Sequence, residues 1–179
     1  MASLRPGGEQ ILSGTSQAAP LVSLAAALLY DSGVRDAADI RQRLMTSTQY
    51  EPDLKGKVRS AGRLNVAKAL AVLHGDVVQL KTGELICGKL RGRDPLQIYS
   101  LSSPLEFDLV RKIIFNYSKD DPQKADLILS FNPNVKLDKL ERFEQTLDIF
   151  PLEIEQADGS VRSINRDEAL DLVLHRPVQ

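Results

Sequence analysis

The stretch from Gln17 to Tyr30, QAAPLVSLAAALLY, is apolar around almost its whole circumference if it forms a helix. A helix of this kind is buried on most sides, because it has no polar face to turn toward water. Pro20 is tolerated if the helix begins at Ser16, since the N–H groups of the first turn have no partner within the helix. The stretch therefore predicts an interior helix that needs packing partners on nearly every side.

Two further helices are expected in the same part of the chain. Gly33 is placed to end the first helix, and Asp36 to begin a second. Asn65 can accept a hydrogen bond from the first turn of a third helix over residues 66–73. The first part of the chain is therefore expected to be helical.

The composition changes at Gly75–Asp76, which we take as the boundary between a part at 1–75 and a β-rich part at 76–179. The first part holds nine Lys/Arg and six Asp/Glu, whereas the second holds fourteen and eighteen. The second part also carries short apolar runs separated by Gly, Pro, Asp and Asn, which is typical of strands and turns. The expected elements are a hairpin at 77–80 and 84–90, strands at 110–117 and 125–131, a helix at 137–147, a second hairpin at 152–155 and 160–164, and a helix or strand at 167–174.

Composition excludes several classes of function. The formal net charge of −1 argues against a nucleic-acid partner held by bulk phosphate attraction. A single cysteine, Cys87, forms no internal disulfide, and two histidines, His74 and His175, leave little room for a multi-histidine metal site. No apolar run approaches the roughly 20 residues needed to span a bilayer. We therefore expect no cofactor, no metal, no nucleic acid and no membrane partner; residues 1–10 lack the apolar core of an export signal, and the compartment stays open.

One constellation carries chemistry, namely Gly14-Thr15-Ser16 directly before the apolar helix. A serine at this point lies at the positive end of a helix, where outward N–H groups would stabilise an oxyanion formed beside its Oγ. Gly14 permits a tight turn and a close approach of substrate. Serine and threonine at this position also act as ordinary helix caps, so the segment alone leaves both interpretations open.

The wider segment, Ser13 to Pro20 (SGTSQAAP), resembles the catalytic-serine motif of the subtilisin-like serine peptidases, or subtilases. Asp39–Thr48 is similar to the next helix of that family. Gly62–Leu70 (GRLNVAKAL) is similar to the segment that closes its catalytic domain. The three matches follow the family's order and cover residues 4–73. The resemblance implies a fragment of an α/β fold, the helical C-terminal part of a subtilase domain, followed by a small β-rich α+β domain.

The resemblance also implies that Ser16 is the catalytic nucleophile. Gln17 and Leu21 stand where the family usually has Met and His, but neither position supplies a catalytic group. The family's Asp and His precede its serine, so here they are expected upstream of Met1. Neither His74 nor His175 lies in a segment of the family's histidine type, so neither is expected to serve as the base.

These inferences define a C-terminal piece of a serine endopeptidase that is inactive alone and acts on a polypeptide substrate only when completed. Without the upstream sheet of the family, the large apolar side chains of the first helix should face water. They are Leu21, Val22, Leu24, Leu28 and Leu29.

The alternative function is a non-enzymatic β-rich interaction module. Residues 78–90 also resemble the first motif of the Sm-like β-barrels, which bind RNA. The acidic balance of residues 76–179 and the ordinary hairpin pattern favour a plain hairpin instead.

Overall fold

The structure is a computed structural model. It describes residues 2–5, 8–11, 14–54, 56–91, 98–100, 103–105, 110–115, 124–129, 141–146 and 149–175. Within these residues the helices are α1 (Thr15–Asp31), α2 (Ala37–Thr46) and α3 (Val66–Ala71), with a 3-10 turn at Pro52–Leu54. The strands are β1 (Ala2–Arg5), β2 (Gly8–Ile11), β3 (Gln49–Tyr50), β4 (Gly62–Arg63), β5 (Asp76–Leu80), β6 (Leu85–Leu90), β7 (Ile98–Ser100), β8 (Ser103–Leu105), β9 (Val110–Ile114), β10 (Lys124–Leu129), β11 (Glu141–Thr146), β12 (Leu152–Glu155), β13 (Val161–Ile164) and β14 (Ala169–Val173).

The three expected helices are present, and local signals set their ends. Gly33 has φ 104° after α1, a conformation that favours glycine, and Val34 N–H bonds the Leu29 carbonyl at 3.1 Å. The Asp36 side chain accepts from Ala38 N at 2.8 Å at the start of α2. The Asn65 side chain accepts from Lys68 N at 2.9 Å at the start of α3, which confirms both predicted caps.

The larger sheet has the strand order β11-β10-β9-β14-β5-β6-β12-β13, and every strand pair in the described residues is antiparallel. The architecture is therefore α+β. Both predicted hairpins form, with Gly83 and Gly159 at positive φ in their turns, and they lie side by side because β6 pairs with β12. The segment for which helix or strand was open, 167–174, contains the central strand β14, between β9 and β5.

The predicted helix at 137–147 is wrong within the described residues. Residues Glu141–Thr146 form β11, which pairs with β10 from Lys124 to Leu129. The hydrogen bonds and packing that β10 offers to this segment favour a strand more than the segment's apolar spacing favours a helix. The rest of that predicted helix lies outside the described residues.

The main core is built from the sheet strands together with the segment that precedes β12. The rings of Phe115 and Phe150 meet edge to face in this core, with 4.8 Å between their centres. Its buried members are Val78, Leu80, Ile86, Val110, Ile113, Phe115, Ile149, Leu152, Ile154, Ile164, Ala169, Leu172 and Leu174.

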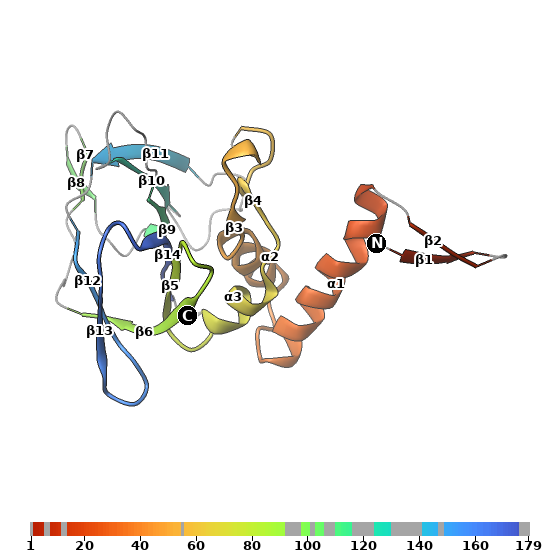
Figure 1. Ribbon diagram of the computed structural model, residues 1–179, viewed down its shortest axis with the longest axis horizontal. Coiled ribbons are helices and arrows are strands. Elements are labelled where there is room, and N and C mark those ends of the chain that lie inside the picture. Colours follow the sequence, from red (N-terminus) through yellow and green to blue (C-terminus); the bar gives the residue numbers. More distant parts are fainter. Residues whose placement is uncertain are drawn as a thin grey trace.

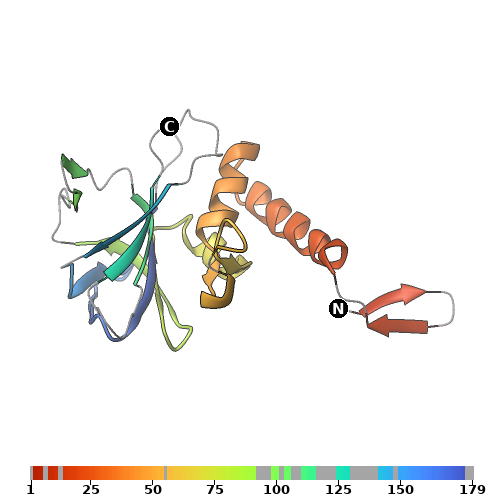
Figure 2. The same cartoon turned by 90° about the horizontal axis from the view of Figure 1, so that it is seen from above.

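The helices α2 and α3 lie between α1 and the sheet (Figure 1), an arrangement also seen from above (Figure 2). Two smaller apolar clusters join residues on either side of Gly75–Asp76, so the helical part shares buried surface with the sheet. One cluster contains Val72, Val77 and Val173, and the other contains Tyr50, Ala61 and Ile114.

Candidate active site

Ser16 lies in the first turn of α1, with an exposed side chain. The helix begins one residue earlier than expected, at Thr15, and Gln17 N–H bonds the Gly14 carbonyl at 3.2 Å. No acidic residue lies in this turn, so the positive end of the helix dipole is not offset by a carboxylate there. The hydroxyl is therefore open to an incoming group at a helix end that favours developing negative charge.

Gly14 precedes the helix with φ 148° and ψ 167°, a backbone conformation that L side chains rarely adopt. A Cβ added at this position would lie 2.9 Å from the Gln17 side-chain oxygen. The Gln17 side chain is flexible and can move, so it is the backbone conformation that favours glycine immediately before Thr15-Ser16.

Pro20 lies inside the helix, beyond its first turn. The expectation that it falls among the N–H groups without helical partners is therefore wrong, because α1 begins at Thr15. Proline has no N–H, so it cannot make the helical bond to the carbonyl of Ser16 four residues earlier.

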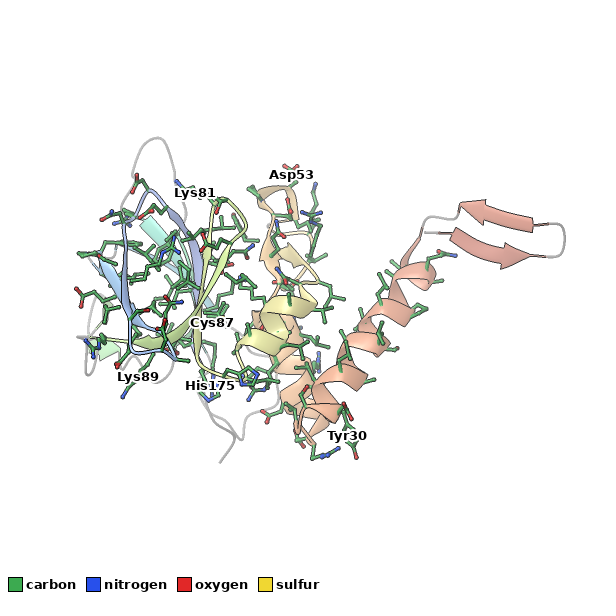
Figure 3. All side chains as sticks on the ribbon, turned by 60° about the horizontal axis from the view of Figure 1, so that its bottom comes forward. Tyr30, Asp53, Lys81, Cys87, Lys89 and His175 are labelled. Atoms are coloured by element: carbon green, nitrogen blue, oxygen red, sulfur yellow. The ribbon has the colours of Figure 1, made fainter. Side chains whose placement is uncertain are left out.

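The two histidines lie away from Ser16. His74 is exposed and follows α3. His175 is only partly buried: its ring Nδ1–H donates to the Val72 carbonyl, and its backbone N–H donates to Asp76 Oδ1 at 2.8 Å. It is thus held against the end of α3 (Figure 3).

The packing of α1 shows why these histidines are remote. The buried Leu29, near its last turn, packs with Ala69 of α3, so the histidines after α3 belong to that end of α1. The ends of a 17-residue helix lie about 25 Å apart at about 1.5 Å per residue. Ser16 is at the other end.

Four large apolar side chains of α1 are uncovered. Leu21, Val22, Leu24 and Leu28 are 47%, 45%, 57% and 39% exposed. These four side chains face water as expected, whereas the same expectation for Leu29 is wrong, because this residue is 1% exposed. The helices α2 and α3 therefore supply partners for only part of α1.

A second group of polar side chains lies at the junction between the helices and the sheet. Lys68, Lys112 and Asp171 are each 0% exposed, and Gln79 is 2% exposed. Lys68 Nζ donates to Asp171 Oδ1 and to Gln79 Oε1, the latter at 2.9 Å. Sequence reasoning missed this group, although a lysine and an aspartate inside the apolar runs VRKII and ALDLV were a visible signal.

The remaining candidates have structural explanations. Cys87 packs against the cluster around Val72, and burial raises the pKa of its thiol, as suits a core residue rather than a nucleophile.

Among the described residues no three His, Cys, Asp or Glu side chains group to hold a metal ion. None of the described helices is both long and apolar enough to cross a bilayer.

In comparisons with protein-family models, curated protein sequences and solved structures, nothing matches this chain. The resemblance to subtilases therefore rests on the three segments of its sequence.

Proposed function

We propose that the chain is the C-terminal part of a subtilisin-like serine endopeptidase in which Ser16 is the nucleophile and a polypeptide is the substrate. The observation that carries the proposal is the set of uncovered apolar side chains on α1, in the helix that begins at the Gly14-Thr15-Ser16 turn. A helix with four large apolar side chains between 39% and 57% exposed lacks a packing partner. A sheet from the preceding part of a peptidase domain would supply one.

The geometry at Ser16 supports the role of nucleophile. Its Oγ would attack the carbonyl carbon of a peptide bond, and the oxygen of that carbonyl would become negatively charged. The positive end of the helix dipole at the N-terminus of α1 would stabilise this charge. Gly14, which carries no side chain, would let the substrate backbone approach.

Neither histidine is placed to act as the general base for Ser16, because both belong to the opposite end of α1. A serine nucleophile without its histidine and aspartate retains at most a residual rate of ~10³–10⁴ over the reaction in water. The proposal therefore includes inactivity of the chain alone and activity only after an upstream part supplies the Asp, the His and the sheet.

The test is labelling with a fluorophosphonate, which reacts with activated serines, on the chain alone and on the chain extended by its in-frame upstream coding sequence. We expect labelling at Ser16 in the extended chain and none in the chain alone. Ser16→Ala should abolish the labelling, and Ser23→Ala, which changes another exposed serine of α1, should leave it intact.

Two results would contradict the proposal. One is an upstream reading frame without Asp and His segments, which would favour the alternative of a β-rich interaction module. The other is peptide cleavage by the chain alone that survives Ser16→Ala, which would place the chemistry elsewhere.

A further inference from the structure

The buried polar group at the junction between the helices and the sheet has a role that is independent of the proposed peptidase activity. Lys68 comes from α3, whereas Gln79, Lys112 and Asp171 come from β5, β9 and β14. Asp171 is far from Lys68 in sequence, and the two side chains meet only because α3 packs on the sheet. The group therefore exists only when the two parts are docked.

Hydrogen bonds cross the junction in both directions. Lys68 of the helical part donates to Asp171 and to Gln79 of the sheet. Lys112 of the sheet donates in turn to the backbone carbonyl of Thr48, just after α2, at 2.6 Å. Both ends of the segment 48–68 are thus tied to neighbouring sheet strands.

Lys68 has to share its carboxylate partner. Lys112 Nζ lies 3.3 Å from Asp171 Oδ2, the oxygen that Lys68 does not use. Among the described residues, the charged groups that face Lys68 are Asp171 from β14 and Lys112 from β9, while Gln79 from β5 offers an uncharged amide oxygen. A fully buried ammonium is costly unless it is well paired, and a second cation beside the same carboxylate weakens that pairing.

We propose that the sheet is a proton-linked clamp for residues 48–68, so that docking of this segment releases a proton from the amine of Lys68. In the docked state, burial lowers the pKa of Lys68 to about 7; Asp171 opposes that change and Lys112 reinforces it. In the undocked state the side chain is in water, and its pKa returns to the ordinary value of 10.5.

The direction of the pH effect follows from these two states. Between pH 7 and pH 10.5 the undocked lysine holds a proton that the docked lysine lacks, so docking strengthens as the pH rises. Below about pH 7 both states are protonated, and Lys68 adds no further pH dependence. The clamp is therefore tighter in alkaline solution than at neutral pH.

The experiment compares urea unfolding of the full chain with that of its Lys68→Met variant at several pH values between 7 and 9.5. Methionine keeps the aliphatic stem and leaves Asp171 beside Lys112. Relative to the variant, the folded-to-unfolded ratio of the wild type should rise by up to about tenfold per pH unit, the limit for one proton. Lys57→Met, the same change at an exposed lysine in the clamped segment, should keep the wild-type pH dependence.

Parallel pH dependence in the wild type and the Lys68→Met variant would overturn the proposal. A second measurement covers a variant that fails to fold. In an NMR titration of lysine side chains in the wild-type chain, one lysine should titrate near neutral pH and lose its separate signal on unfolding. If every lysine in the folded chain titrates above about pH 9, the clamp is not proton-linked.

Discussion

The uncovered leucines of α1 lead to a quantitative prediction, because the same helix carries a covered and an uncovered leucine. Complete burial of a leucine side chain stabilises a protein by about 1.5–3 kcal/mol. Leu24 is 57% exposed and realises less than half of this, so Leu24→Ala should cost about 1 kcal/mol or less. Leu29 is 1% exposed among Val34 and Ala69, and Leu29→Ala should cost about 2.7–5 kcal/mol, including the cavity.

The two variants can be compared by urea unfolding of the chain, followed by far-UV circular dichroism at one pH and one protein concentration. The substitution and the helix are the same, so helix propensity cancels between them, and the difference reports burial. Leu29→Ala should lower the folded-to-unfolded ratio at least tenfold more than Leu24→Ala, because about 1.4 kcal/mol corresponds to a factor of ten.

Equal destabilisation by the two changes would refute the reasoning. It would mean that the Leu24 side of α1 is covered in solution, for example by a second copy of the chain. A dependence of unfolding on protein concentration would identify that case.

Two further predictions concern the sheet. Asp171→Asn leaves two buried lysines without their carboxylate and should destabilise the chain by about 3–5 kcal/mol in urea unfolding. An effect below about 1 kcal/mol would show that Asp171 does not offset the cost of burying the two lysine charges. Gly88→Ala places a Cβ 2.2 Å from the Glu155 carbonyl, between β6 and β12, and should destabilise the chain by about 1–3 kcal/mol. The control Ser163→Ala, at an exposed position of the edge strand β13, should change the stability by no more than about 0.5 kcal/mol in the same assay. Equal effects of the two substitutions would show that β6 and β12 are not closely paired.

The sequence predicted the helix starts and the hairpin turns, because these features depend on residues that are neighbours in the chain. Asp36 and Asn65 cap the helices that follow them, and Gly83 and Gly159 lie in the turns of the two predicted hairpins. These features depend on a few neighbouring residues, so the sequence displays them directly.

Features that depend on distant contacts were missed or mistaken. The strand β11 at 141–146 exists because β10 lies beside it, and the apolar spacing within the segment does not indicate that neighbour. The meeting of Lys68 with Asp171 is likewise a product of how α3 packs on the sheet. The position of Ser16 at a helix start was predicted, whereas the place of His175 against α3 required the fold.

The apolar clusters that span Gly75–Asp76 have a consequence for the evolution of this chain. Val72 and Val77 contribute to one cluster from opposite sides of the boundary, and Tyr50 meets Ile114 in another. A recombination event at that boundary would give each half a partner with mismatched shape and charge. The helical and sheet halves should therefore stay together in homologous proteins. Substitutions at Lys68, Lys112 and Asp171 should likewise occur together.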